Sequence, residues 1–406
     1  MLRLMLILIS GKSLICLGRR APLLALAALL GATPPSQAAP NRATARLETP
    51  ASELLFGPEL SFTNERIQDQ QGRTRQTDSP VAVAAMGKFR QRVLELCIEQ
   101  LRLCQITSER DAKGYDSYRI EVSSPRGRDA WWFRLSYDPG VIEVQMQPST
   151  LRDLEARQGL IQRLIFDAAD LAELRPFMWS GGGHLHLDAQ RAFGSNVRVF
   201  RDFIVDMNNH AALFLFLMRG SPANAPALWM LPDARQRSFL RLLAEVDARP
   251  NAWQVETLAD AIKSRVYSET VENWAPADKY QFINITRLTQ RGPRGFAESE
   301  RTAEVRGLGP QYSAEQLLML AEILEARLNW IRRRVARGEA PLEWSPLRFP
   351  LSTGYATLSP PELREAFDQY LRESGFRSRA RFASFFLDSA PEPHRLCRGL
   401  FTRTLN

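Results

Sequence analysis

Apolar positions along the chain follow two spacings, which predict long helices mixed with short strands. Segments with apolar residues at i, i+3, i+4 and i+7 are typical of amphipathic helices. The predicted helices are 81–103, 151–173, 196–219, 234–246 and 314–337, and Ser313 is the expected N-terminal cap of the last one. Short runs bounded by turn residues predict strands at 53–62, 118–123, 131–136, 141–146, 281–288 and 302–307.

Tight turns between neighbouring strands indicate how these strands pair. In the sequence Tyr-Asp-Pro-Gly at 137–140, proline presets φ and glycine supplies a positive φ. Turns this short join antiparallel strands, since parallel strands need long crossovers. We therefore predict an α+β fold in which helices pack on a mostly antiparallel sheet.

The N-terminus has the pattern of a cleaved export signal. Arg19 and Arg20 precede an apolar run at 21–32, and Ser36 and Ala38 occupy the −3 and −1 positions of a small-residue cleavage site. Residues 1–39 are thus a predicted leader and 40–52 a linker, so we expect a periplasmic or secreted protein without a stable membrane span. A retained membrane anchor, or a cytoplasmic protein whose true start codon lies downstream, is the alternative.

Charge gives little reason to expect a nucleic-acid partner. The 406 residues carry a formal charge of +8, and four of the positive charges lie in the first 38 residues, which contain no acid. Removing them leaves 49 basic against 45 acidic residues. No long basic run interleaved with aromatics follows, which argues against nucleic-acid binding.

The cysteines are predicted not to form a local disulfide. Cys16 belongs to the leader, and Cys97 and Cys104 are seven positions apart, on one face if both are helical. Two helical turns separate their Cα atoms by about 10 Å, which exceeds the reach of a disulfide. Cys397 is then a candidate partner for either one, or all three are free.

Candidate chemistry begins at a glycine run that leads into two histidines. Gly181, Gly182 and Gly183 precede His184 and His186, two of the four histidines in the chain. Residues i and i+2 of a strand face the same side of the sheet, so both imidazoles should project from one face. Histidines beside a bare backbone suit a metal ion or a phosphate.

Several other strands carry charged residues at positions that alternate with apolar ones. Glu59 and Glu143 lie in two of the predicted strands, and Glu304 alternates with Arg306 in a third. Unpaired charges cost several kcal/mol each when buried, so a sheet face made of these residues is either wet or binds cations.

The ordered set of these motifs resembles the carboxylate–amine ligases of the glutamine-synthetase fold, especially amidoligases and glutamate–cysteine ligases. The resemblance covers about 53–337, a predicted catalytic domain, and leaves 338–406 as a C-terminal extension of unknown role. It depends on Gly57, Glu59 and Ser61, on 138–143, on Pro148 and Thr150, on Gly182, His184 and His186, on Asn284, and on Thr302, Glu304 and Arg306.

The resemblance implies a curved sheet that forms a funnel for ATP and Mg²⁺. Glu59, His184 and Glu304 would bind the metal that bridges the phosphates, and Glu143 the second metal, because Ser61 stands where the family has another glutamate. His186 would contact nucleotide, and Arg306 the phosphate or carboxylate. Glu59, Glu304 and Arg306 would thus be the catalytic residues. The substrate would be an amino acid or peptide with a carboxylate and an amine. An amide bond would form through an acyl phosphate.

Two other interpretations remain open at this stage. The chain is alternatively an exported relative that binds an amino-acid or cell-wall ligand without catalysis, or a metal-dependent hydrolase of amides that needs no ATP. In the ligase interpretation, the loops at 68–78 and 290–300 would determine which substrate binds. Candidate phosphate contacts are Arg291 and Arg294 in the second loop and Arg301 just after it.

Overall fold

The structure is a computed structural model. It describes residues 53–68, 80–110, 116–127, 129–138, 140–176, 183–217, 225–267, 280–289, 301–347, 360–376 and 382. The predicted leader and linker, Cys397, Gly181, Gly182 and nearly all of both substrate loops lie outside these residues. Among the described helices, none is both long and apolar enough to cross a bilayer.

A nine-stranded sheet forms the centre of the described chain, in the order β2-β3-β4-β5-β1-β7-β9-β8, with β6 paired to β1. Every observed pairing is antiparallel, which confirms the predicted α+β class. The strands are β1 (Phe56–Thr63), β2 (Leu103–Arg110), β3 (Asp116–Ser123), β4 (Trp131–Asp138), β5 (Val141–Met146), β6 (Arg175–Pro176), β7 (His184–Asp188), β8 (Ile283–Asn284) and β9 (Thr302–Val305).

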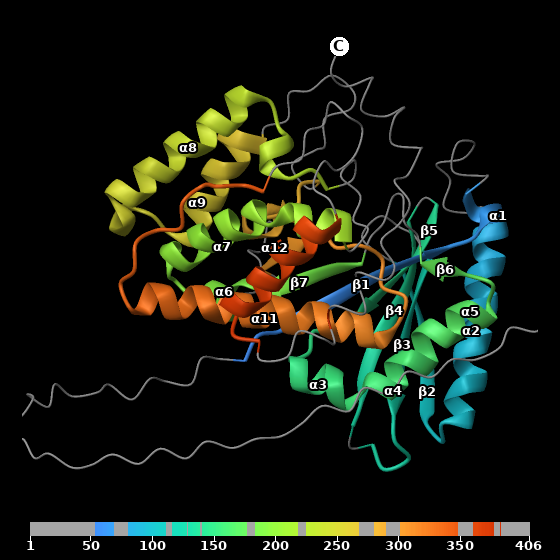
Figure 1. The fold of residues 1–406 in the computed structure, drawn as a ribbon. Coiled ribbons are helices and arrows are strands. Elements are labelled where there is room, and N and C mark those ends of the chain that lie inside the picture. The colour runs from blue at the N-terminus through green and yellow to red at the C-terminus, as the bar shows by residue number, and fades with distance from the viewer. Residues whose placement is uncertain are drawn as a thin grey trace, which may run out of the picture. The chain divides into compact units, whose positions relative to one another are not determined.

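Helices surround this sheet and connect its strands (Figure 1). They are α1 (Glu65–Gln68), α2 (Pro80–Glu99), α3 (Leu151–Ala156), α4 (Gln158–Ile161), η1 (Gln162–Asp167), α5 (Ala168–Leu171), α6 (Ala189–Phe193), α7 (Val197–Asn209), η2 (Leu213–Leu217), η3 (Leu228–Met230), α8 (Asp233–Ala248), η4 (Pro250–Ala252), α9 (Val255–Ile262), η5 (Lys263–Tyr267), α10 (Thr286–Thr289), α11 (Ala314–Ala336) and α12 (Pro360–Glu373). As predicted, the Ser313 side chain caps α11 by accepting from the Gln316 amide.

The two faces of the sheet differ in polarity because strand residues alternate sides. On one face, Phe62 of β1 packs edge-on against Phe89 of α2 and Phe166 of η1, each at 5.9 Å between ring centroids. The β5 partners of Phe62 and Leu60 on this face are also apolar and buried. The opposite face carries the polar residues of β1, β5 and β7, including Glu59 and Ser61.

Helix α2 ends earlier than predicted, and this changes the disulfide assignment. It stops at Glu99, and Leu101 adopts a positive φ of 51° that reverses the chain into β2. Cys104 therefore lies in a strand, and its Cα is 6.3 Å from that of Cys97, with which it forms a disulfide. The prediction that these two cysteines do not pair is wrong, because it assumed one continuous helix.

Other boundaries differ in smaller ways. The predicted strand 281–288 contains only two strand residues, and its remainder turns into α10. The predicted helix 196–219 leaves α-helical geometry after Asn209. Strand β2 and helices α9 and α12 were not predicted. The turn after β4 has the expected positive φ, 93° at Gly140.

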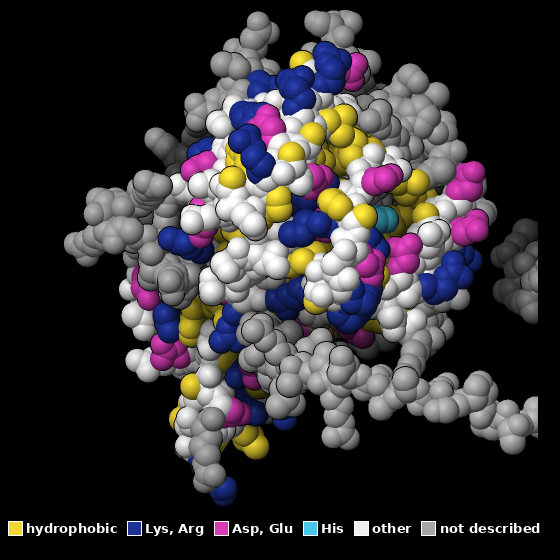
Figure 2. All heavy atoms as spheres, turned by 90° about the vertical axis from the view of Figure 1, so that its left-hand side faces the viewer, with side chains coloured by type: hydrophobic (Ala, Val, Ile, Leu, Met, Phe, Trp, Pro, Cys, Tyr) yellow, Lys and Arg dark blue, Asp and Glu magenta, His cyan; other side chains and the backbone are white. Residues whose placement is uncertain are grey.

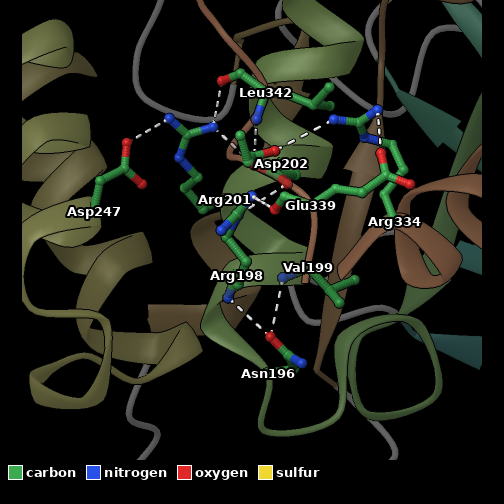
Figure 3. Close-up of polar contacts among 10 residues, drawn as sticks. Asn196, Arg198, Val199, Arg201, Asp202, Asp247, Arg334, Glu339 and Leu342 are labelled. Atoms are coloured by element: carbon green, nitrogen blue, oxygen red, sulfur yellow. Dashed lines mark hydrogen bonds and ion pairs between the residues drawn. The ribbon is translucent and has the colours of Figure 1, made fainter. Parts of the chain in front are cut away.

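Part of the C-terminal extension packs along α7. Arg201 donates to the carbonyl oxygen of Leu342 and to both Asp202 and Asp247, while Asp202 accepts from the Leu342 amide (Figure 3). Further along, α12 contacts α11 through Arg327 and Glu373, 3.0 Å apart. Residues 338–347 and α12 are therefore attached to the helices beside the sheet.

Surface charge is mixed on the face in Figure 2, where basic and acidic side chains alternate over short distances. Elsewhere among the described residues several arginines form ion pairs, for example half-buried Arg265 with Glu245 at 2.6 Å. The described part of this face shows no single-sign region.

Candidate functional site

Strand register brings the polar residues predicted for the site onto one face. Glu59 of β1 is the direct partner of His184 on β7, and His186 is the partner of Glu304 on β9. Glu304 in turn pairs with Asn284 on β8. Since directly paired residues project to the same side, four adjacent strands contribute to one cluster.

Short distances connect the two histidines to the two glutamates. His186 Nε2 lies 3.1 Å from Glu59 Oε2. His184 Nδ1 lies 3.0 Å from Glu304 Oε1 and 3.8 Å from Glu59 Oε1. One ligand atom each from Glu59, His186 and Glu304 falls within 4.8 Å of the others, a spacing that suits a single metal ion. His184 borders both carboxylates of this group.

Neighbouring polar groups fix the orientation of these side chains. Thr302 Oγ1 is 3.2 Å from His186 Nδ1, which leaves Nε2 directed at Glu59. Asn284 Nδ2 donates to Glu304 Oε2 at 2.6 Å, and Asn284 Oδ1 accepts from the amide and hydroxyl of Thr286. Such outer hydrogen bonds hold metal ligands in place in known sites. Thr286 was not predicted to take part.

Gly57 lies opposite His186. It is the direct strand partner of His186, and a Cβ atom at this position would be 3.4 Å from the His186 Cβ, an ordinary van der Waals contact. Alanine would therefore fit, and only a larger side chain on the same face would compete with the imidazole.

Arg306 approaches the cluster from the end of β9. Its Nη1 donates to Glu304 Oε1 at 2.7 Å, and its guanidinium lies 5.2 Å from the Tyr280 ring centroid. The Arg306 amide donates to the carbonyl oxygen of Phe282 at 2.9 Å. At Gly307, a Cβ would be only 1.8 Å from the Phe282 ring, so glycine is required for this approach.

Burial and neighbouring charges shift the pKa values in this cluster. Burial raises the pKa of Glu304, but the charges of His186 and Arg306 outweigh it and lower that pKa to about 2. Burial also raises the pKa of Glu59, but the nearby imidazoles of His184 and His186 bring it well below its ordinary value. Burial lowers the pKa of His184, as does Arg306, yet contacts with Glu304 and Glu59 leave it raised. Both carboxylates are therefore ionised at neutral pH.

Several buried polar atoms of this face lack a hydrogen-bond partner within the described structure. They are Ser61 Oγ, Arg306 Nε and both ring nitrogens of His184. His184 Nδ1 is close to Glu304 Oε1, but the two atoms are not aligned as donor and acceptor. Buried polar atoms are nearly always paired, and these four atoms are donors and acceptors that a polar ligand or ion could satisfy.

Two predicted site residues lie outside this group. Glu143 is the strand partner of Ser61 and shares its face, but it does not belong to the three-residue group of possible metal ligands. Arg301 precedes β9, and its Nη1 binds Glu256 of α9 at 2.8 Å. The cluster therefore contains Glu59, His184, His186, Glu304 and Arg306.

No protein-family model matches the sequence, and no curated protein is significantly similar to it. The chemistry of the donor set is thus the starting point for a functional assignment. Imidazole and carboxylate ligands together suit Mn²⁺, Fe²⁺ or Zn²⁺, and the carboxylates alone suit Mg²⁺.

Proposed function

We propose that this chain is a metal-dependent carboxylate–amine ligase that uses ATP. The observation that carries the proposal is the cluster itself: Glu59, His184, His186, Glu304 and Arg306 come from β1, β7 and β9 and meet on one polar sheet face. This chain order and this face are what the resemblance to glutamine-synthetase-fold ligases implies. We also propose that the sheet of this chain forms the funnel of that fold.

Glu59, Glu304 and the two histidines would hold a divalent cation, and Glu143 would assist at a second position. The unpartnered nitrogens of His184 and the close, unaligned contact with Glu304 fit a shared cation between them. A bound Mg²⁺ supplies charge neutralisation for phosphoryl transfer.

Arg306 would bind phosphate oxygens beside the metal ligands. A guanidinium suits an oxyanion because it offers several N–H donors in one plane. In the reaction, a substrate carboxylate oxygen attacks the γ-phosphorus and ADP leaves. The amine nitrogen then attacks the carbonyl carbon, phosphate leaves, and the amine gives up a proton.

Calorimetric titration of Mg·ATP into the chain tests the proposal. We expect saturable binding by the wild type and its loss in Glu59→Gln, with ADP release when amino acids or peptides are supplied. Asp260→Asn on the exposed side of α9 is the matched control, and it should bind as the wild type does. Absence of nucleotide binding by folded wild type would contradict the ligase assignment.

One observation favours a second candidate, an exported metal-dependent enzyme or binding protein that needs no ATP. The Cys97–Cys104 disulfide is typical of oxidising compartments, where ATP is scarce. Alkylation of the isolated protein without reductant tests this candidate. Protection of Cys97 and Cys104, together with metal binding and no nucleotide binding, would favour it over the ligase.

A further inference from the structure

The polar face that holds the metal-ligand cluster continues across three more strands. The direct strand partner of Glu59 on β5 is Gln145, whose partner on β4 is Arg134, whose partner on β3 is Arg119. We call this row, Glu59–Gln145–Arg134–Arg119, the polar strip. It connects the cluster to a pair of arginines on the same face.

Exposure increases along the polar strip. The side chain of His184 is 3 % exposed and that of Glu59 is 13 % exposed, whereas those of Arg134 and Arg119 are each 31 % exposed. A molecule from solvent therefore has access to the arginine end while the cluster end is buried. This gradient suits a ligand that lies along the strip with one end inserted.

The arginine end carries two like charges directly opposite each other, an arrangement that destabilises a sheet unless counter-charges are present. Arg134 Nη2 is 2.9 Å from Glu109, and Arg119 Nε is 3.0 Å from Glu121. The Arg119 guanidinium also lies 4.5 Å from the Trp132 ring centroid, which holds it in place. Arg134 Nε is buried without a partner in the described structure.

Each guanidinium has five N–H donors, so one carboxylate does not exhaust it. A second carboxylate shared by Arg134 and Arg119 would reduce their mutual repulsion. At the other end, the carboxylates of Glu59 and Glu304 have more lone pairs than one metal ion would take, so they can also accept from an amino group. The strip therefore offers acceptors at its buried end and guanidinium donors at its exposed end.

Strand spacing sets the length of a ligand that reaches both ends. Neighbouring strands are about 4.8 Å apart, which puts Arg134 about 10 Å and Arg119 about 14 Å from Glu59 across the sheet. An extended peptide spans about 3.3 to 3.6 Å per residue, so three or four residues cover this distance.

Resting on the proposed ligase function, we propose that the polar strip binds the amine substrate and that this substrate is a short peptide. Its amino group lies at the Glu59–Glu304 end, its backbone crosses Gln145, and its C-terminal carboxylate binds Arg134 and Arg119.

Calorimetry with glycine peptides on the full chain in Mg²⁺ tests this assignment. Triglycine and tetraglycine should bind at least about tenfold more tightly than diglycine or triglycinamide, because only they place a carboxylate on the arginines. Arg134→Gln and Arg119→Gln should each remove this preference. Arg241→Gln, on the exposed side of α8, is the control and should retain it.

Several outcomes would overturn the peptide assignment. Equal binding of triglycine and triglycinamide would do so, as would unchanged peptide affinity in folded Arg134→Gln. Loss of Mg·ATP binding in that variant, without an effect on peptides, would assign the arginines to phosphate instead. If Arg134→Gln proves unstable, Arg134→Lys takes its place in the test. Because lysine preserves the positive charge, this variant should retain part of the peptide affinity.

Metal binding, measured in parallel, separates this assignment from the proposed function. Mn²⁺ binding without arginine-dependent peptide binding would remove the peptide assignment and leave the metal site intact. Arginine-dependent peptide binding without metal or nucleotide binding would overturn the ligase and support a peptide-binding protein.

Discussion

The sheet and the helices beside it each bury a cluster of charged side chains, and the two clusters differ in how completely their atoms are paired. In the helical cluster, Asp206 of α7 accepts from Arg327 of α11 at 2.5 and 2.8 Å. Arg327 also binds Glu373 of α12, and it stacks 4.3 Å from the Tyr370 ring centroid. None of these side chains has an unpartnered buried atom in the described structure.

The sheet cluster is also largely buried, but it is incompletely paired. His184 leaves both ring nitrogens without a hydrogen-bond partner, and Arg306 Nε and Ser61 Oγ are in the same state. Similar residue types thus serve two purposes. The fully paired helical cluster attaches α12 to α7 and α11, whereas the sheet cluster has donors and acceptors left for a ligand.

The largest expected effect comes from breaking the helical cluster. Asp206→Asn leaves the Arg327 charge buried with a weaker partner, and removal of one member of a buried pair costs about 3 to 5 kcal/mol. We expect a loss of this size in the free energy of unfolding from urea titration, with metal affinity unchanged. Exposed Asp260→Asn should change it by less than about 0.5 kcal/mol. A wild-type urea midpoint for Asp206→Asn would contradict the structural role.

Acid should weaken the same cluster in a defined pH range. Burial raises the pKa of Asp206, but the Arg327 and His210 charges lower it from its ordinary 3.8 to about 2. A depressed folded-state pKa stabilises above the unfolded pKa, so this contribution is complete above about pH 4 and is lost as pH falls toward 2. It amounts to about 2 kcal/mol. The difference in unfolding free energy between wild type and Asp206→Asn should shrink over this range; a constant difference would contradict the assignment.

A smaller effect is expected at the edge of the sheet cluster. Gly307→Ala places a Cβ 1.8 Å from the present position of the Phe282 ring, which must move. Overpacking of this kind costs about 1 to 3 kcal/mol. Because Phe282 also holds the Arg306 backbone, metal affinity should fall as well. Thermal unfolding and metal titration check both effects, and an unchanged melting temperature would show that the ring relocates freely.

The smallest stability effect should come from the sheet cluster itself. Glu59→Gln removes a charge whose described partners are two histidines, and it relieves repulsion from Glu304. We expect the metal-free variant to unfold within about 1 kcal/mol of the wild type, as is common where residues serve binding rather than folding. A loss of unfolding free energy comparable to that of Asp206→Asn would contradict this prediction, because it would show that the sheet cluster also stabilises the fold.

Local patterns predicted several of the strands and the shared face of the histidines, because alternation along one segment determines both. The sequence also placed Glu304 and Arg306 on one side of their strand. It did not predict that Glu304 pairs with His186, because register depends on partners 118 positions away.

The early end of α2 and the buried helical cluster were also beyond local pattern. Leu101 reverses the chain without a glycine or asparagine to signal a positive φ, so the disulfide at Cys97 was missed. Asp206 and Arg327 are polar residues in amphipathic helices, where polarity ordinarily indicates solvent. Both are buried because α7, α11 and α12 pack against one another.

Metal titration tests the central claim, that the unpaired sheet cluster is a binding site, most directly. Calorimetry or electron paramagnetic resonance measures the Mn²⁺ affinity of each variant. The wild type and Asp206→Asn should bind Mn²⁺ with similar affinity. Glu59→Gln and His186→Gln should bind at least about a hundredfold more weakly, since each removes a ligand. Saturable binding that depends on Glu59 and His186 is the result we predict. Equal binding by all four proteins, or none by folded wild type, would contradict it.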